Sequence, residues 1–245
     1  MDGILSVEGR EKIFGAKLNL TKGKLVDHRR PLRFTPIAVR GLAGHRLGSV
    51  DFKGYIGFVD GPEAQIDARH RFQNDRGHFE IKLPRWAILP GKAQPQDLIP
   101  LLRGHEADVS GAVTADARVN WSGARMTSTG SIGFADLDFG TTPAAFSGIN
   151  GTIIFDDLLE LKSKGEQTQK IGSVDAGLPL RSGDVRFDLP SNGSLNILSA
   201  TWPLAGGTIS FRDVNIPTSF VATIKSLDVK EIARSIDIKD LEAEC

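Results

Sequence analysis

The segment Val109–Trp121 alternates between small or apolar residues and mostly polar ones. Its odd positions are Val109, Gly111, Val113, Ala115, Ala117, Val119 and Trp121, and Ala112 is the one apolar residue among the even positions. Because successive β residues point to opposite faces, this pattern predicts a long strand with one apolar and one wet face. The alternation recurs along almost the whole chain. The apolar face of such a large sheet must therefore be covered in the folded protein.

Composition excludes several classes of protein. The chain has 245 residues, of which 40% are hydrophobic, and this is enough for a core and argues against disorder. Thirty basic and thirty acidic residues cancel, so no nucleic-acid partner is expected. The single cysteine, Cys245, is the last residue and cannot form an intrachain disulfide.

The two ends of the chain predict a piece of a longer protein. Residues Met1–Arg10 lack the basic start and long apolar core of a signal peptide, and no stretch of about 18 apolar residues predicts a membrane-spanning helix. Residues Asp237–Glu244 indicate an edge strand left open for further pairing. We expect residues 1–245 to form a single continuous β segment of a larger protein.

Turn residues and alternation divide the chain into strands. The turn Asp60-Gly61-Pro62 predicts a hairpin between runs 50–58 and 64–72, and a change of apolar phase predicts a β-bulge near Ala135–Asp136. Two short helices are predicted, at Pro95–Arg103 and Val229–Ile236. The other predicted strands are 14–20, 79–83, 109–121, 126–139, 149–155, 159–163, 169–175, 184–189, 194–202, 207–214 and 220–227.

This order of elements narrows the architecture without fixing it. There is no alternation of strand and helix, and the turns are short, so the strands are expected to be mostly sequential and antiparallel. An open sheet of about a dozen strands curls, closes or splits into two layers. A sandwich, a closed barrel and an elongated curved groove all remain open.

Three blocks of sequence resemble the YdbH family of AsmA-like proteins. Together they cover roughly Leu89 to Cys245, while residues 1–88 carry strand patterns but no recognisable motif. The blocks are Leu89-Pro90-Gly91-Lys92 through Pro95 to Gly104 with Val109-Ser110-Gly111; Gly148-Ile149-Asn150-Gly151 through Leu158 with Ile171–Leu180; and Ala200-Thr201-Trp202-Pro203-Leu204-Ala205-Gly206-Gly207.

The resemblance implies a fold and a function. The fold is mainly β, an elongated, curved, mostly antiparallel sheet forming an open apolar groove, with two short helices. The function is that of a periplasmic bridge in Gram-negative bacteria that carries phospholipid between the inner and outer membranes, without chemistry or a cofactor. The resemblance also implies an inner-membrane anchor in the full-length protein and a small outer-membrane lipoprotein that extends the sheet.

Both lines of reasoning predict which residues contact lipid. Strands lie about 4.8 Å apart, so thirteen of them give roughly 60 Å of groove. Acyl tails would cover the apolar face while head groups stay at the wet edge. The expected lining residues are Val109, Val113, Val119, Trp121, Ile132, Phe134, Ile153, Phe155, Ile209, Phe211, Phe220 and Ile224.

Enzyme and metal signatures are weak in this sequence. No His-Glu-x-x-His, Gly-x-Ser-x-Gly or cysteine pair occurs. His70 and His78 flank Asp75, but exposed histidines near a hairpin are commoner than such a metal site. The pairs Asp136/Asp138 and Asp156-Asp157 are explained by a turn or a solvated strand face. We therefore expect no catalytic or metal-binding residues.

Two other functions stay open beside lipid transfer. One is a structural or assembly scaffold of the cell envelope that acts through β-edge pairing. The other is a secreted β-sandwich binding module. An apolar face without an opposing sheet favours lipid transfer, whereas two packed sheets favour the sandwich.

Overall fold

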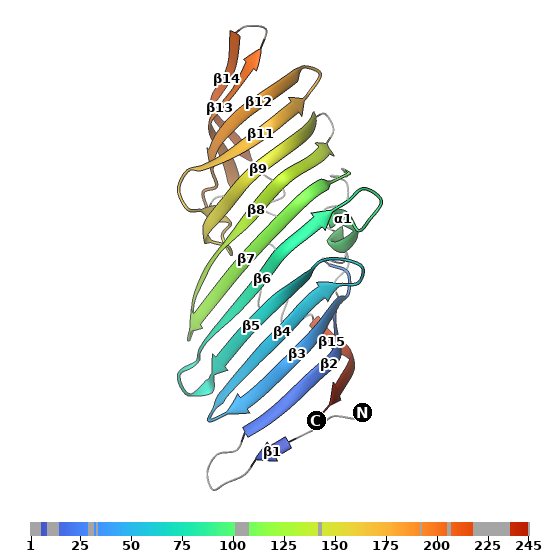
Figure 1. The fold of residues 1–245 in the computed structure, drawn as a ribbon. Coiled ribbons are helices and arrows are strands. Elements are labelled where there is room, and N and C mark those ends of the chain that lie inside the picture. Colours follow the sequence, from blue (N-terminus) through green and yellow to red (C-terminus); the bar gives the residue numbers. More distant parts are fainter. Residues whose placement is uncertain are drawn as a thin grey trace. The chain divides into compact units, whose positions relative to one another are not determined.

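The computed structural model describes residues 6–8, 15–28, 32, 34–100, 108–141, 144–191, 193–204, 207–217 and 236–244. Within them the chain is almost entirely β (Figure 1). Two helical turns are present, the 3₁₀ turn Phe72–Asn74 and α1, Pro95–Leu98. The strands are β1 Ser6–Glu8, β2 Gly15–Asp27, β3 Ile37–Arg46, β4 Ser49–Phe58, β5 Glu63–Arg71, β6 Arg76–Ile88, β7 Ser110–Ser122, β8 Arg125–Thr141, β9 Ala144–Asp157, β10 Lys162–Ser163, β11 Gln167–Asp175, β12 Pro179–Asp188, β13 Ser194–Leu204, β14 Gly207–Pro217 and β15 Ile236–Glu244.

One antiparallel sheet contains all of these strands. Its order is that of the chain, β1-β2-β3-β4-β5-β6-β7-β8-β9-β11-β12-β13-β14, while β10 pairs with β9 and β15 pairs with β2. The predicted hairpin is confirmed as β4 and β5, which pair from Ser49↔Arg71 to Gly57↔Glu63. Because the described strands belong to one sheet, they do not form the two packed sheets of a sandwich.

The predicted β-bulge in β8 is confirmed. The register between β8 and β9 shifts between Phe134 and Leu137, and Asp136 has a φ of 46°. The Asn150 side chain fastens the bulge, because its Oδ1 accepts from the Asp136 N–H and its Nδ2 donates to Asp136 Oδ1, both at 3.0 Å. The carboxylate of Asp138 accepts from the Gly148 N–H at 2.6 Å. The Asp136 carboxylate thus accepts from the Asn150 side chain, and the Asp138 carboxylate accepts from the backbone.

Some predicted elements differ from the structure. The helix at Pro95–Arg103 is only the single turn α1, and residues 101–107 lie outside the described residues. The predicted strand 159–163 shrinks to β10, because Leu161 has a φ of 51° in the preceding turn.

The C-terminal expectations have mixed outcomes. Residues 229–235 of the second predicted helix and the predicted strand 220–227 lie outside the described residues, and Ile236 begins a strand. The strand expected at Asp237–Glu244 is present as β15. It pairs on one side with β2 of the same chain, from Ile236↔Asp27 to Glu244↔Asn19, and no other described strand pairs with it.

The chain divides into two compact units. The first unit comprises Met1–Leu83, Asp116–Ser128 and Lys230–Cys245, and the second comprises Pro84–Ala115 and Thr129–Val229. Strands β6, β7 and β8 contribute residues to both. Each unit is described by itself below.

Trp202 organises the buried core of the second unit. It clusters with Val174 and Ala200, and the partly buried Phe146, Ile171, Leu180, Val185 and Ile197 pack against this cluster. The indole of Trp202 lies over Gly183 of the neighbouring strand, where a Cβ atom would overlap the ring. A glycine is therefore needed at position 183 for the indole to reach this place.

Gly183→Ala is predicted to lower the free energy of unfolding by about 1–3 kcal/mol, because the added methyl overpacks the site against Trp202. Gly140→Ala in β8 is the control, since a Cβ there would meet no atom within 4 Å. Urea unfolding followed by tryptophan fluorescence measures both. Equal losses in the two variants would contradict the packing of the indole on Gly183.

Two buried glutamines on β11 have different environments. Gln167 is 8% exposed; its Oε1 accepts from the Ile154 N–H at 3.1 Å and its Nε2 donates to the Lys164 carbonyl at 2.7 Å. Gln169 is 6% exposed, and neither atom of its amide has a hydrogen-bond partner. Gln167 therefore hydrogen-bonds backbone groups of β9 and of the residue after β10. Gln169 instead has a buried amide without a hydrogen-bond partner, which lowers the stability of the fold.

Gln167→Leu is predicted to lower the free energy of unfolding by about 1–3 kcal/mol, because it leaves the Ile154 N–H without its partner. Gln169→Leu is predicted to leave stability unchanged or to raise it, since it removes unpaired polar atoms. The two substitutions are chemically identical and two residues apart. Urea unfolding that ranked the two variants in the opposite order would contradict this assignment.

Candidate functional site

The first unit has one apolar face and one charged face. Residues that pair across antiparallel strands point to the same face, so the register defines rows of side chains that cross the sheet. The apolar residues of these rows are mostly half-buried. Three rows form the apolar face of the first unit: Leu18, Ala43, Phe52, Ala68 and Phe79; Leu20, Gly41, Gly54, Ile66 and Ile81; and Gly23, Val39, Ile56 and Ala64.

Trp121 belongs to the next row of this face. His45, Val50, His70 and Gly77 pair in sequence across β3 to β6, and the Trp121 indole lies over Gly77. Its Nε1 donates to Nδ1 of His70 at 3.0 Å. The structure thus brings the predicted lining residue Trp121, and with it the alternating Val119, to the apolar face of the first unit.

The second unit repeats this arrangement. Phe134 pairs with Gly151, and a Cβ on Gly151 would meet the amide of Gln169, so these three residues share a face. From Gln169 the row continues through pairs to Val185, Ala200 and Phe211. The same face also carries Ile132, Ile153, Phe155, Phe187, Ile197, Trp202 and Ile209.

Val113 lies on this same apolar face. A Cβ on Gly133 would meet the Thr114 hydroxyl, and Gly133 pairs with the exposed Thr152. Thr114 therefore points to the face opposite Phe134, and its neighbour Val113 points to the face of Phe134. The register thus places seven predicted residues on the apolar face of the second unit: Val113, Ile132, Phe134, Ile153, Phe155, Ile209 and Phe211.

Three of the predicted lining residues are not placed on either apolar face. Val109 precedes β7, and its N–H donates to Gln94 Oε1 at 2.8 Å. Gly111, which lies between Val109 and Val113, has a φ of 119° and breaks the alternation of faces. The strand pattern therefore does not carry over to Val109. Phe220 and Ile224 lie outside the described residues.

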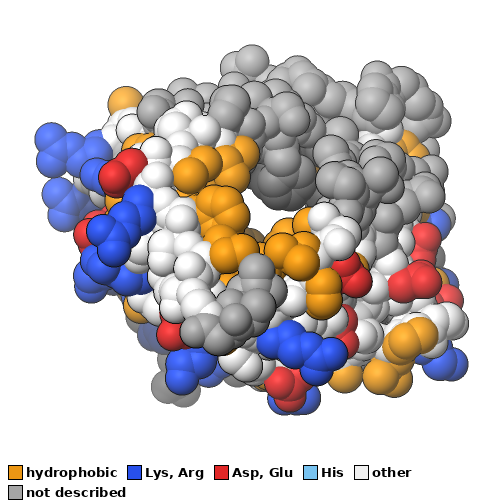
Figure 2. Space-filling model, turned by 90° about the horizontal axis from the view of Figure 1, so that it is seen from above, with side chains coloured by type: hydrophobic (Ala, Val, Ile, Leu, Met, Phe, Trp, Pro, Cys, Tyr) orange, Lys and Arg blue, Asp and Glu red, His pale blue; other side chains and the backbone are white. Residues whose placement is uncertain are grey.

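Few side chains of the apolar faces are fully buried. Of the hydrophobic residues that the structure describes, ten are buried: Ala64, Ile88, Leu98, Ala112, Leu137, Phe155, Val174, Phe187, Ala200 and Trp202. Phe211 remains 47% exposed and Ile216 40%. Figure 2 shows hydrophobic side chains gathered together on the visible surface, with most of the Lys, Arg, Asp and Glu side chains elsewhere on it. This amount of exposed apolar surface is typical of a binding surface.

The opposite face of the first unit carries ion pairs. Arg40 binds Glu63 through two nitrogens and stacks on Tyr55 at 4.2 Å, and Arg118 binds Glu80 at 2.6 Å. Lys53 lies 2.9 Å from Asp67. Its hydrogen bond lowers the pKa of the Asp67 carboxyl below its ordinary value, and the same bond raises the pKa of Lys53. These exposed pairs keep this face wet and contribute little stability.

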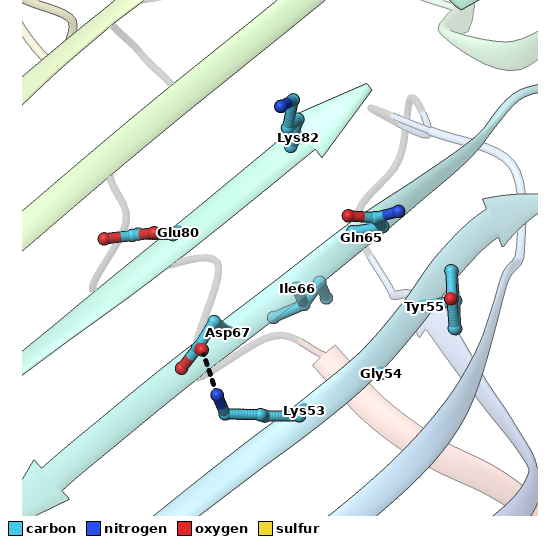
Figure 3. A pocket seen from close by; sticks show the side chains of 8 residues that line it. All are labelled: Lys53, Gly54, Tyr55, Gln65, Ile66, Asp67, Glu80 and Lys82. Atoms are coloured by element: carbon cyan, nitrogen blue, oxygen red, sulfur yellow. Dashed lines mark ion pairs between the residues drawn. The ribbon is translucent and has the colours of Figure 1, made fainter. Parts of the chain in front are cut away.

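A shallow depression of about 430 Å³ lies on this charged face. Lys53, Tyr55, Gln65 and Asp67 line it together with Glu80 and Lys82 from β6 (Figure 3). Its polar rim does not suit an acyl chain, so the candidate lipid-binding surface is the opposite, apolar face of the sheet.

The two histidines that flank Asp75 point to opposite faces of the sheet. His70 pairs with Gly77 on the apolar side, whereas His78 pairs with Arg69 on the charged side and lies 3.6 Å from Asp67. They cannot hold one ion between them. Among the described residues no group of three His, Cys, Asp or Glu side chains is arranged to hold a metal ion.

Sequence reasoning missed part of the apolar faces. Strands β2 to β6 contribute Leu18, Phe52, Ile66, Phe79 and Ile81, which alternate as clearly as the predicted set but were assigned only to strands. In the second unit the missed residues are Val185 and Phe187 of β12 and Ile197 of β13. The signal that would have found them is cross-strand register, which alternation within one strand does not give.

One of the comparisons with known proteins found a match. The model of the YdbH-like family, described as intermembrane phospholipid transport protein YdbH, matches residues 4–244 and so extends over residues 4–88, where the sequence carries no recognisable motif. No curated protein and no solved structure matched the chain. None of the helices in the described part of the chain is long and apolar enough to cross a membrane. Because the family match spans nearly the whole sequence, this chain belongs to the YdbH-like family of intermembrane phospholipid transport proteins.

Proposed function

We propose that this chain is a segment of a periplasmic bridge that carries phospholipids along an open groove formed by its apolar sheet faces. The observation that carries the proposal is the set of continuous apolar rows in each unit, which no second described sheet covers. Apolar surface left in water costs about 25 cal/mol per Å². Acyl chains that lie along the rows remove this cost.

The proposed lining combines predicted and newly found residues. In the second unit it consists of Val113, Ile132, Phe134, Ile153, Phe155, Ile209 and Phe211, with Val185 and Ile197 added from the register. In the first unit it consists of Val119 and Trp121, with Phe52, Ile66, Phe79 and Ile81 added. Head groups would remain at the hairpin ends, in contact with water.

The proposed mechanism is physical transport without a reaction. The family is described by the transport of phospholipid between membranes, and this description implies work in the periplasm. The full-length protein is proposed to have an inner-membrane anchor and to meet a small outer-membrane lipoprotein that extends the sheet. Neither is part of the described residues.

A photo-crosslinking amino acid at position 153 is predicted to capture phospholipid, while the same group at position 154 is not. Ile153 pairs with Ile132 on the apolar face, whereas the neighbouring Ile154 pairs with Ser131 and is 43% exposed on the other face. Mass spectrometry of the irradiated protein identifies the adduct. Equal capture at both positions would rule out the assignment of faces.

Ile153→Asp in the full-length protein is predicted to abolish phospholipid transfer, and Ile154→Asp to leave it unchanged. An unpaired carboxylate among acyl tails costs several kcal/mol of desolvation, whereas the face that Ile154 shares with Asp156 is exposed and already carries that carboxylate. Transfer of fluorescent phospholipid between two populations of vesicles measures the effect.

Circular dichroism of both Asp variants is the control for folding. If Ile153→Asp folds like the original protein and still transfers lipid at the original rate, the apolar face of the second unit is not the route.

A further inference from the structure

The Trp121 side chain reaches across one strand to contact the next. Trp121 lies on β7 and His70 on β5, and β6 runs between them in the sheet (Figure 1). The indole passes over Gly77 of β6, where a Cβ atom would lie 2.2 Å from Cζ2 of the ring. It then stacks on the His70 imidazole, with ring centroids 6.0 Å apart and an angle of 21° between the planes. A glycine at position 77 is therefore needed for this contact.

One hydrogen bond fixes the indole in this place. Trp121 Nε1 donates to His70 Nδ1 at 3.0 Å. An indole N–H can only donate, so Nδ1 must be the acceptor and cannot carry a proton. The other ring nitrogen, Nε2, lies 3.9 Å from Oδ1 of Asp75, and Phe72 packs edge-on against the imidazole with centroids 4.8 Å apart. The contact between His70 and Trp121 therefore requires the neutral imidazole.

His70 shares its face of the sheet with few other titratable groups. Besides Asp75, the described titratable group in the cross-strand row of His70 is His45, which lies beyond Val50. Alternation and register direct the charged or titratable neighbours to the opposite face: Asp51, Arg69, Arg71, Arg76, His78, Glu80 and Arg118. His45 and His70 are thus the described groups of this row whose charge changes near neutral pH.

Protonation of His70 removes the hydrogen bond to Trp121. Histidine changes its charge between pH 5 and 8. In the imidazolium both nitrogens carry a proton, so Nδ1 would face the indole N–H as a second donor. The hydrogen bond is therefore present at the upper end of this pH range and is lost as the pH falls through it.

The hairpins around this contact are joined by other hydrogen bonds. The Gly123 N–H donates to the Asp75 carbonyl at 2.8 Å, and Arg76 Nε donates to the Ser122 hydroxyl at 3.1 Å. Both bonds link the β5–β6 hairpin to the β7–β8 hairpin, and neither involves an imidazole. Protonation of His70 is therefore expected to free the indole without separating the hairpins.

We propose that His70 and Trp121 form an acid-sensitive switch on the apolar face of the first unit. With a neutral imidazole the indole stays over Gly77 and its N–H is paired. With a protonated imidazole the same place carries a positive charge and an indole N–H without its partner. The effect on cargo rests on the proposed function: because a charge under an acyl chain is poorly tolerated, acid weakens the binding of lipid tails to the first unit.

The first test follows the indole N–H groups by nuclear magnetic resonance. The ¹⁵N-labelled chain is titrated from pH 8 to pH 5, and the Trp121 signal is identified by its absence from Trp121→Phe. We expect the Trp121 Nε1–H signal to move upfield as the pH falls, because the proton loses its acceptor. The signals of Trp86 and Trp202 are expected to stay in place. A Trp121 signal that does not change over this range would overturn the proposal.

Histidine variants assign the titrating group. His70→Asn keeps an acceptor near the place of Nδ1 but does not titrate, so the pH response of Trp121 should disappear. His45→Asn in the same row and His78→Asn on the opposite face are the controls and should keep it. His70→Gln replaces His70→Asn if circular dichroism shows that the latter does not fold. A response that persists without His70, or is lost without His45, would overturn the proposal.

The second test measures contact with lipid at two pH values. A photo-crosslinking amino acid at position 79, two residues from Gly77 on the same face, is irradiated with vesicles of phosphatidylcholine, whose head group keeps its charge over this range. Capture is expected to be at least about fivefold lower at pH 5.5 than at pH 7.5. In His70→Asn the two values should be equal. Capture at position 153 of the second unit is the control and should not depend on pH.

The outcomes separate this proposal from the proposed function. If the Trp121 signal titrates but capture at position 79 is the same at both pH values, the switch does not control lipid and that part of the inference fails alone. If neither position captures lipid at either pH, the proposed function fails, while the Trp121 signal still decides whether the switch exists.

Discussion

The two-residue period of the β-strand, sustained from one strand to the next, is the constraint on which this structure depends. This period places apolar side chains on one face of the sheet, and no second sheet among the described strands covers them. In a sandwich the same pattern would bury these residues against a partner layer. Here Phe211 is 47% exposed and Ile216 40%, and acyl chains could cover such apolar side chains.

Residues with a positive φ angle inside the long strands keep the apolar side chains of each strand on one face. Asp136, Gly148, Ser182 and Asp213 have positive φ angles and lie in β8, β9, β12 and β14. Each inserts a three-residue step between apolar positions, as from Phe134 to Leu137 or from Phe211 to Val214, without moving the second residue to the wet face. Where such a residue makes a β-bulge, as Asp136 does, it also increases the local twist of the sheet.

The sequence predicted the strands and their apolar faces because alternation is a local property. It found the bulge at Asp136 from a change of phase, and it identified seven residues that the register brings to one face of the second unit. It assigned Val109 to that face because Gly111 was assumed to be regular, and it could not foresee the pairing of β15 with β2, which joins residues more than 200 positions apart. The row through Gln169, Val185 and Ala200 was also missed, because it crosses three strands and alternation within one strand does not give their register.

The chemistry of the apolar rows explains how a cargo could be held and still move. Contacts between acyl chains and side chains such as Ile66, Phe79 or Ile153 are non-directional, and each pair of atoms contributes only about 0.1–0.2 kcal/mol. A tail that slides past one row exchanges these contacts for equivalent ones on the next, so no single step has a large barrier. Hydrogen bonds along the route would act as traps. The described apolar faces offer few polar side chains, so a sliding tail would meet few such traps.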